Sequence, residues 1–380
     1  MNNQLLPPLS LYVHIPWCVK KCPYCDFNSH ISNSIDEKKY LAALMADLDT
    51  ELETVNARPI KSIFFGGGTP SIFSPDTINR IIEGAQQRMT FDDNIEVTME
   101  ANPGTFEQKN FSEFHAAGIN RLSIGIQSFN DQHLKNIGRV HDAQQAMSAI
   151  NTAQEAGFDN INLDLMFGLP EQNIKQAIND IKIACNQNVQ HISHYQLTIE
   201  ANTFFHKHPP VTPDMETLWD MQNQCHDALN NNGFKQYEVS AFSLPDKQCI
   251  HNLNYWNFGD YIGIGAGAHG KITDTSSGKI LRRWKRRQPE DYMTHAASSP
   301  LSGQSEIKVD ELIFEFLLNA LRLKNGFSYE VFELNTGLDR KAVIEACLTI
   351  DAELLLMDDW GIRCSDKGYR FLNDILEKFI

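Results

Sequence analysis

Residues 12–25 read Tyr-Val-His-Ile-Pro-Trp-Cys-Val-Lys-Lys-Cys-Pro-Tyr-Cys and place Cys18, Cys22 and Cys25 directly after a short apolar run. A cubane iron-sulfur cluster takes four cysteine ligands. A loop that supplies three leaves one iron free for a ligand from solution, much as catalytic zinc sites keep one position open. The C-x-x-x-C-x-x-C spacing therefore predicts a [4Fe-4S] cluster with one open iron.

Zinc is the main rival for these three thiols. A structural zinc site needs a fourth Cys or His, and His14 or His30 could complete one. The remaining cysteines are scattered singly, at Cys185, Cys225, Cys249, Cys347 and Cys364. They form no second C-x-x-C knuckle, so zinc is the weaker alternative and a set of free core thiols is weaker still.

Short β-rich runs alternate with amphipathic helical patterns through the first half of the chain. The expected strands cover residues 10–15, 62–65, 96–100, 121–126, 160–164 and 191–196. This alternation predicts an α/β fold with parallel strands joined by right-handed crossovers. Six units are too few for a closed eight-stranded barrel, so we expect a partial (β/α)6 barrel that is open on one side.

Polar residues follow these expected strands where a barrel carries its functional groups, at the carboxyl ends. The sequence Gly-Gly-Gly-Thr-Pro at 66–70 follows the second strand, and Glu100 and Asn102 end the third. Gln127, Asp164 and Gln196 end the fourth, fifth and sixth. These side chains are expected to share one edge of the barrel.

The sequence divides into three expected regions. Residues 1–240 form the partial barrel, 241–300 a linking region, and 301–380 a small helical domain with a hairpin near 357–363 that resembles a winged helix. Winged helices often bind DNA, but this one is acidic, and the whole chain has a net charge of −15. We therefore expect no nucleic-acid partner.

Composition places the chain among ordinary globular proteins, with 380 residues, 42% hydrophobic and 21% charged. The amino terminus has no signal-peptide pattern, and no apolar run reaches membrane-spanning length. Eight cysteines without paired spacing do not indicate a disulfide framework. These features favour a cytoplasmic protein.

The cysteine motif, its place after the first strand and the glycine turn together resemble the radical SAM superfamily over about the first 240 residues. That resemblance implies that the open iron is chelated by S-adenosylmethionine, which the reduced cluster cleaves to an adenosyl radical. The implied S-adenosylmethionine contacts are Tyr12, Tyr24, Gly67, Gly68, Thr69, Glu100, Gln127, Arg139 and Asp164. The rival interpretation of each polar residue is a rim residue or a helix cap.

Within the superfamily the chain is most similar to the coproporphyrinogen III dehydrogenase group, HemN and its relatives. The shared runs are 12–18, 66–70, 100–103 and 125–129. The dehydrogenase has a further cysteine where this chain has Phe27, and a longer segment before its cluster motif. Both departures resemble the shorter HemW branch, whose members are regarded as heme chaperones.

The run His251-Asn-Leu-Asn-Tyr-Trp256 matches a motif that the HemW branch associates with heme binding. A histidine can ligate heme iron, and aromatic neighbours can pack on the macrocycle. A packed structural histidine is an equally good interpretation, and Cys249 and His269 are competing ligands. The basic run at 282–287 could meet heme propionates, anionic lipid or an acidic partner, although a solvated loop is the simpler reading.

Two functions follow from the resemblance. The first is a heme chaperone that binds heme and passes it to recipient proteins while it carries a [4Fe-4S] cluster and S-adenosylmethionine. The alternative is an oxygen-independent coproporphyrinogen III oxidase or another radical enzyme acting on a tetrapyrrole. We expect the dehydrogenase activity to be absent. The sequence is compatible with a dimer and with a peripheral membrane contact. No catalytic residue is assigned.

Overall fold

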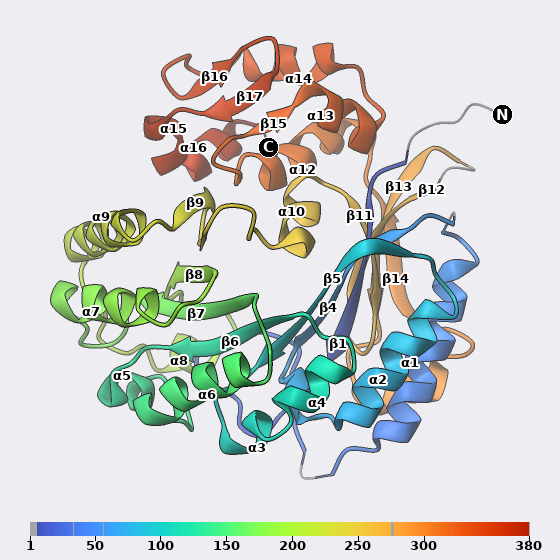
Figure 1. Cartoon of the computed structure of the whole chain (residues 1–380). Helices are drawn as coiled ribbons and strands as arrows, with labels where there is room; N and C mark the ends of the chain where they lie inside the picture. The colour runs from blue at the N-terminus through green and yellow to red at the C-terminus, as the bar shows by residue number, and fades with distance from the viewer. Residues whose placement is uncertain (1–5, 33, 56, 275–276, 380) are drawn as a thin grey trace.

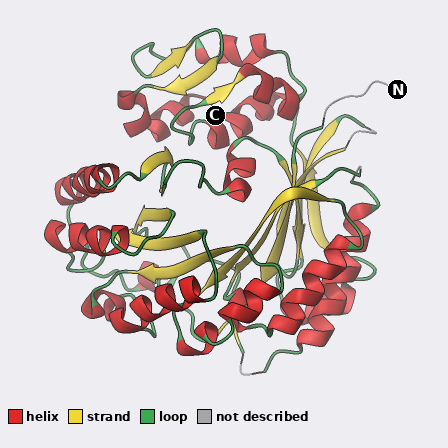
Figure 2. Ribbon diagram, in the orientation of Figure 1, coloured by secondary structure: helices red, strands yellow, loops and turns green. Residues whose placement is uncertain are grey.

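The computed structural model describes residues 6–32, 34–55, 57–274 and 277–379. Its centre is a large sheet with the strand order β14-β13-β12-β11-β1-β4-β5-β6-β7-β8-β10-β9. Helices cover the convex side of this curved sheet, and a separate domain sits above its open side (Figures 1 and 2). The six expected strands are confirmed as β1 (Leu9–Ile15), β4 (Ile60–Gly67), β5 (Phe91–Ala101), β6 (Arg121–Gln127), β7 (Ile161–Phe167) and β8 (His191–Gln196).

These six strands are parallel neighbours, as the alternation of strand and helix predicts. β1, β6 and β7 carry nearly continuous buried runs, which are typical of parallel strands covered on both faces. The crossover helices are α1 (Glu37–Leu52), α2 (Pro75–Gln86), α3 (Thr105–Gln108), α4 (Phe111–Ala116), α5 (Asp131–Asn136), α6 (Ala143–Glu155) and α7 (Ile174–Cys185). The result is the expected partial barrel.

Local sequence signals set the limits of these helices. Asp142 caps α6 and Asn173 caps α7, each with a reciprocal capping box. Gly118 and Gly157 follow α4 and α6 with φ of 104° and 96°, a conformation that glycine adopts without a steric penalty. These two glycines therefore let the chain turn out of each helix towards the next strand.

The segment 241–300, expected to be a linking region, contributes the strands β10, β11, β12 and β13 to the large sheet. β11 (Asp260–Ile264) lies parallel to β1, and the antiparallel strands β12 (His269–Asp274), β13 (Lys279–Lys285) and β14 (Leu301–Glu306) extend the sheet beyond it. β10 (Ala241–Ser243) and β9 (Lys235–Glu238) extend the opposite edge. The remaining elements before the C-terminal domain are β2 (Trp17–Cys18), β3 (His30–Ile31), η1 (Pro70–Ile72), α8 (Phe204–Lys207), α9 (Met215–Asn231), α10 (Ile250–Trp256) and α11 (Pro289–His295).

The C-terminal domain has its own apolar core. Its elements are α12 (Val309–Ala320), β15 (Phe327–Ser328), α13 (Tyr329–Thr336), α14 (Arg340–Cys347), β16 (Leu355–Met357), β17 (Gly361–Cys364), α15 (Asp366–Arg370), α16 (Leu372–Leu376) and η2 (Glu377–Phe379). Three helices followed by the β16–β17 hairpin match the winged-helix pattern read from the sequence. Phe258, from the turn after α10, packs into this core and joins the domain to the barrel.

The basic run at 282–287 is mostly strand, so its reading as a solvated loop is wrong. Lys285 is 1% exposed and forms ion pairs with Asp47 and Glu51 of α1, and Arg283 pairs with Glu51 at 2.8 Å. Arg282 pairs with Glu315. Most of this positive charge is therefore neutralised inside the molecule.

Candidate functional site

One cavity of about 300 Å³ opens at the carboxyl ends of the parallel strands. It brings together residues that lie far apart in the sequence, from the cysteine loop to the end of β8. The sequence-predicted residues that line it are Cys18, Cys22, Cys25, Tyr24, Gly67, Gly68, Thr69, Glu100, Gln127, Arg139 and Asp164. Tyr12 and His251 are not among its lining residues.

The three thiols lie on the loop that leaves β2, and each is partly exposed. Burial raises the pKa of the Cys18 and Cys25 thiols. Among the described residues, no three Cys, His, Asp or Glu side chains converge closely enough to hold a single metal ion. In an iron-sulfur cluster each thiolate ligates a different iron, so thiols spread around one cavity suit a cluster better than a single zinc ion.

The glycine turn after β4 closes against this loop. A Cβ on Gly68 would lie 2.4 Å from the carbonyl oxygen of Trp17, so only glycine fits there. The Gly68 and Thr69 amides donate to the carbonyls of Ile15 and Trp17, both at 2.8 Å. These amides are thus engaged within the chain, and the turn fixes the position of the cysteine loop.

Two carboxyl groups face each other across the cavity. Burial, together with the nearby Asp164 carboxylate, raises the pKa of Glu100 to about 8. Burial also raises the pKa of Asp164, although it accepts hydrogen bonds from Asn162 at 2.8 Å and Ser123 at 3.0 Å. The pair is suited to bind hydroxyl or cationic groups, because a positive or donating ligand relieves the repulsion between the two acids.

Arg139 reaches the cavity from the turn after α5. Its Nη2 donates to Asn102 Oδ1 at 2.6 Å and to the Gly125 carbonyl at 2.7 Å, while Nη1 lies 3.7 Å from Cys22 Sγ. Asn102 in turn donates to Thr69 Oγ1 at 3.0 Å. One chain of hydrogen bonds thus links the arginine, the glycine turn and a thiol.

The sequence placed Asn102 at this edge of the barrel without a cofactor role and gave no role to Tyr195 or Ser123, and all three line the cavity. The Tyr195 hydroxyl donates to Gln127 Oε1 at 2.7 Å and fixes that amide. Tyr195 and Asn102 could have been predicted to line the site, because they lie at or just beyond the ends of expected strands. Ser123 lies mid-strand, where nothing in the sequence distinguishes it from a core serine.

Tyr12 lies within the barrel. Its hydroxyl is 3.0 Å from His14 Nδ1, its ring stacks on Phe64, and burial raises its pKa. Tyr12 therefore supports the cysteine loop through His14, whose Nε2 is 2.9 Å from the carbonyl of Asn28.

His251 is 2% exposed and packs from α10 against β4. Its Nδ1 is 2.8 Å from Ser62 Oγ, its ring stacks on Phe64 at 5.0 Å, and Nε2 has no hydrogen-bond partner. Burial lowers its pKa to about 3, which leaves a neutral imidazole. Its competitor Cys249 is buried against Glu96 at 3.4 Å, whereas His269 is exposed on β12.

Two family models match the chain: the radical SAM superfamily over residues 12–184 and the HemN C-terminal domain over 307–371. The heme chaperone HemW of Haemophilus influenzae is 45% identical over 99% of this chain and 98% of its own length. HemW of Escherichia coli is 44% identical over 99% of both. The chain belongs to the HemW family.

One solved structure is similar in fold to this HemW-family protein over its whole length. Coproporphyrinogen III oxidase (HemN) from Escherichia coli matches with a TM-score of 0.83 over 100% of this chain and 91% of that one, at 23% identity. The radical SAM domain implies a [4Fe-4S] cluster and S-adenosylmethionine. The cavity offers Cys18, Cys22 and Cys25 for the cluster, and Glu100, Asp164 and Arg139 beside them for the polar groups of S-adenosylmethionine.

No helix among the described residues of this family member is long and apolar enough to cross a bilayer.

Proposed function

We propose that the protein is a heme chaperone, which binds heme and transfers it to recipient proteins while it carries a [4Fe-4S] cluster and S-adenosylmethionine. The observation that carries this proposal is the relation to HemW proteins over 99% of the chain, at 45% identity. The cavity supports the cofactor part, because it is lined by three thiols of the cysteine loop, by acids of β5 and β7, and by Arg139 from the turn after α5.

We further propose roles for the cavity residues. Cys18, Cys22 and Cys25 ligate the cluster, and Tyr24, next to two of them, packs against the adenine of S-adenosylmethionine. The backbone at 67–69 and the side chains of Glu100, Gln127, Arg139 and Asp164 hold the remainder of that molecule. Tyr12, which the family resemblance also places among these contacts, does not line the cavity and supports the cysteine loop through His14.

His251 is proposed as an axial heme ligand. Its neutral imidazole and unpartnered Nε2 support this role. Its 2% exposure means that α10 must move before iron can reach it.

Heme titration of the full-length protein tests the proposed function. The protein is reconstituted anaerobically with its cluster and titrated with heme, with and without S-adenosylmethionine, and the Soret band is followed as a difference spectrum. We expect saturable binding and transfer of heme to an apo-hemoprotein. Absence of saturable binding overturns the proposal.

The alternative, oxidation of coproporphyrinogen III, is tested in parallel. Reduced, cluster-loaded protein is incubated with S-adenosylmethionine and coproporphyrinogen III. Formation of protoporphyrinogen at enzymatic rates would contradict a purely chaperone role. We expect none, since Phe27 replaces a cysteine beside the cavity and is 63% exposed there.

We also propose that the protein works in the cytoplasm, where reducing conditions keep the cluster thiols free. A dimer and a peripheral membrane contact stay predictions. Analytical ultracentrifugation tests the first and co-sedimentation with anionic vesicles the second.

A further inference from the structure

The short helix α10 carries His251 and lies between the barrel and the C-terminal domain (Figure 1). His251 is the second residue of this helix and is 2% exposed. A heme iron cannot reach its imidazole while the first turn of α10 stays docked on the barrel. The contacts that hold this turn therefore decide when the proposed ligand can be used.

The first turn of α10 has no cap of its own. The first amides of a helix find no acceptor within the helix and depend on a capping group. Cys249 occupies the capping position, and its side chain makes no capping hydrogen bond. The amides of Ile250 and His251 donate instead to the carboxylate of Glu96 on β5, at 3.1 and 3.0 Å. The cap of α10 thus comes from a strand that lies 154 residues before Ile250 in the chain.

Glu96 is itself held inside the molecule. Its side chain is 5% exposed and accepts from the Cys249 thiol at 3.4 Å. The Nε of Arg121, at the start of β6, lies 3.9 Å from its other carboxylate oxygen. A buried carboxylate needs hydrogen-bond donors and a nearby cation, and hydrogen bonds to it are strong because they are charge-assisted. Glu96 therefore binds the first turn of α10 firmly for as long as that turn is docked.

The chain enters α10 from a turn at the surface. Residues 244–248 connect β10 to the helix, and Pro245, Asp246 and Gln248 in this stretch are exposed. An exposed turn has few packing contacts that oppose a change of conformation. The amino end of α10 can therefore move without disturbing the sheet.

The chain leaves α10 through contacts with the C-terminal domain. The side-chain amide of Asn335, on α13, donates to the carbonyl of Asn257 at 2.6 Å. Phe258 is 1% exposed and packs in the core of that domain. The guanidinium of Arg322 lies 4.3 Å from the ring centre of Trp256, the last residue of α10. The carboxyl end of the helix is therefore anchored.

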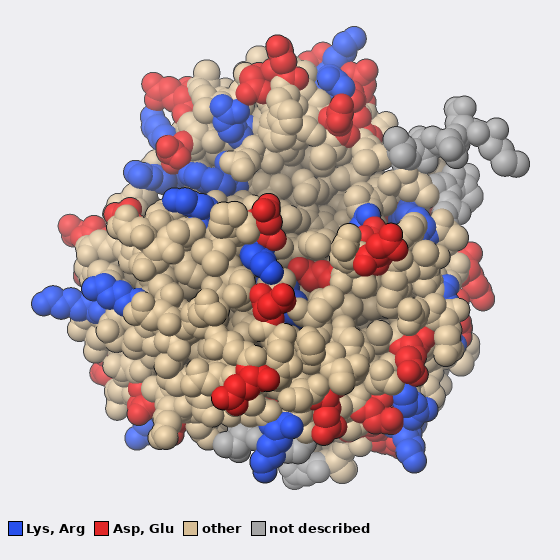
Figure 3. All heavy atoms as spheres, viewed as in Figure 1, with Lys and Arg blue, Asp and Glu red and all other residues tan. Residues whose placement is uncertain are grey.

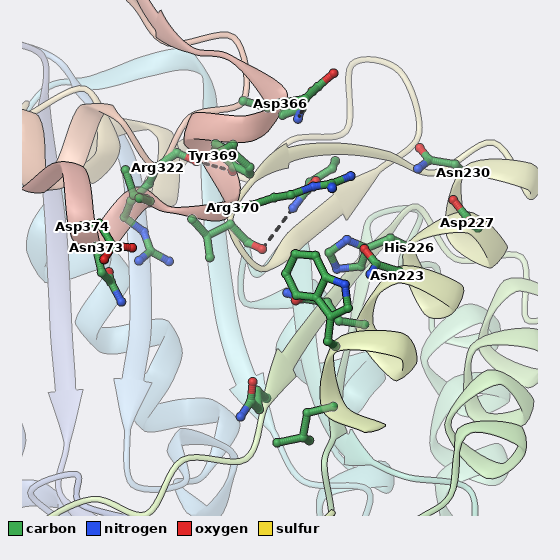
Figure 4. Close-up of a pocket in the computed structure, with 18 of the residues that line it drawn as sticks. Asn223, His226, Asp227, Asn230, Arg322, Asp366, Tyr369, Arg370, Asn373 and Asp374 are labelled. Carbon is green, nitrogen blue, oxygen red and sulfur yellow. Dashed lines mark hydrogen bonds and ion pairs between the residues drawn. The ribbon is translucent and has the colours of Figure 1, made fainter. Parts of the chain in front are cut away.

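The C-terminal domain is in turn fixed to the edge of the barrel. The amide of Lys324 donates to the carbonyl of Tyr237 at 2.9 Å. Arg322 pairs with Glu238 of β9 at 3.2 Å. Figure 3 shows Lys and Arg side chains gathered along this boundary, at the upper left. Arg322 also lines a cavity of about 730 Å³ between α9, β9, α15 and α16 (Figure 4). The anchor of α10 is therefore held against the large sheet.

We propose that Glu96 is a positioning residue for heme binding: it keeps the first turn of α10 docked, and His251 becomes accessible to iron only when its hydrogen bonds to this turn break. The proposal rests on the proposed chaperone function, with His251 as the axial ligand, and names the step that controls the ligand. Without its cap the first turn loses the acceptor of two amides and frays, and His251 lies in that turn. The remainder of α10 stays anchored at its carboxyl end.

Heme binding then depends on how often the first turn is released. The apparent affinity of a site falls with the fraction of molecules in which the site is competent. A weaker hold by Glu96 raises that fraction, so it should make heme binding faster and tighter. Damage to the heme site itself would make binding slower or weaker. The direction of the effect thus distinguishes a positioning residue from a merely structural one.

The test is stopped-flow mixing of heme with full-length, cluster-loaded protein, followed at the Soret band. We expect Glu96→Gln to bind heme about tenfold faster than the wild type. The substitution keeps the size of the side chain but replaces one accepting oxygen by an amide group and removes the charge, which weakens two charge-assisted hydrogen bonds. In the wild type the observed rate should level off as heme increases, because release of the turn is a step within the protein.

Asp180→Asn is the matched control. Asp180 of α7 is 3% exposed and, like Glu96, its carboxylate accepts from a backbone amide, that of Phe129 at 2.8 Å. It has no hydrogen bond to α10 among the described residues. We expect Asp180→Asn to bind heme at the wild-type rate, and far-UV circular dichroism verifies that both variants fold.

Hydrogen exchange of the wild type gives an independent answer if Glu96→Gln does not fold. Exchange of backbone amides is followed by mass spectrometry with and without heme. We expect the peptide that contains Ile250 and His251 to exchange faster in the heme-bound protein, because these amides lose the Glu96 carboxylate. Residues 258–262, beyond the anchored end of α10, should keep their protection.

The outcomes separate this proposal from the function on which it rests. If folded Glu96→Gln binds heme no faster than the wild type, or if heme leaves the exchange of the Ile250 and His251 amides unchanged, the role of Glu96 is overturned and the chaperone function stands. If His251→Ala binds heme as the wild type does, the roles of His251 and Glu96 are both overturned, and the chaperone function again stands. If the wild type binds no heme, the chaperone function itself fails.

Discussion

At the scale of single residues, the three cysteines are the clearest case. Their spacing alone indicated a cluster, and the structure sets them around one cavity with the strand-end acids. We expect Cys22→Ser to lose the iron and the broad cluster absorbance near 400 nm, because two thiolates cannot hold the cluster against exchange. Iron analysis after anaerobic reconstitution measures this. Cys185→Ser, on α7 and away from the cavity, is the control and should load iron normally.

Glu100 gives a pH-dependent prediction. Its pKa is about 8 in the folded protein against an ordinary 4.5, so between these values the folded chain holds a proton that the unfolded chain has lost. The stability that Glu100 contributes is therefore full below pH 4.5 and falls as the pH rises towards 8. Glu100→Gln should raise the Tm of the cluster-free protein more at alkaline than at acidic pH.

Thermal unfolding of Glu100→Gln across this pH range measures the effect. The matched control is Glu83→Gln on the exposed side of α2. A difference in Tm between wild type and Glu100→Gln that does not change with pH would contradict the raised pKa.

At the scale of elements, hydrophobic pattern located the parallel strands but not the antiparallel edge. The sequence did not predict β13, because a run of charged residues is typical of a solvated loop. In the structure Lys285 and Arg283 are buried and pair with acids of α1. A sequence shows charges but not their partners, which here lie more than 200 residues away. This strand could not be predicted from the sequence, because the ion pairs that let its charges be buried are tertiary contacts.

That buried cluster predicts a large stability effect. Lys285→Ala leaves Asp47 buried without a cation and Glu51 with Arg283 alone, so it should lower the free energy of unfolding by about 3–5 kcal/mol. Lys279→Ala, on the same strand but half exposed and paired with Glu306, should cost about 0–1 kcal/mol. Urea unfolding of both variants checks the contrast, and equal losses would disprove it.

At the scale of the whole molecule, the barrel and the C-terminal domain were both predictable, because each follows from local periodicity. Their mutual placement was not, since it depends on contacts such as Phe258 with the C-terminal core and Arg322 with Trp256. The cavity of about 730 Å³ between α9, β9, α15 and α16 arises only from this placement. No motif in the sequence marked it.

Phe258 tests how firmly the two parts are joined. It is 1% exposed and contacts Phe316 of α12, so Phe258→Ala should cost about 3–5 kcal/mol through the cavity it leaves. We expect limited proteolysis to release the C-terminal domain faster from this variant. Phe371→Ala, half exposed within the same domain, should be cleaved at the wild-type rate.

Two cavities of the protein are lined by residues that emerge from the ribosome at different times. The residues that line the cysteine cavity all lie at or before residue 195, but β1 and the cysteine loop are held by later residues, through β11 and through the carbonyls of Ala266 and Arg287 that accept from Asn28. The cavity of about 730 Å³ needs residues 369–374 of α15 and α16 as well as α9. During translation the three thiols therefore emerge long before the segment that fixes their loop, and a chain cut before residue 260 would lack those supports.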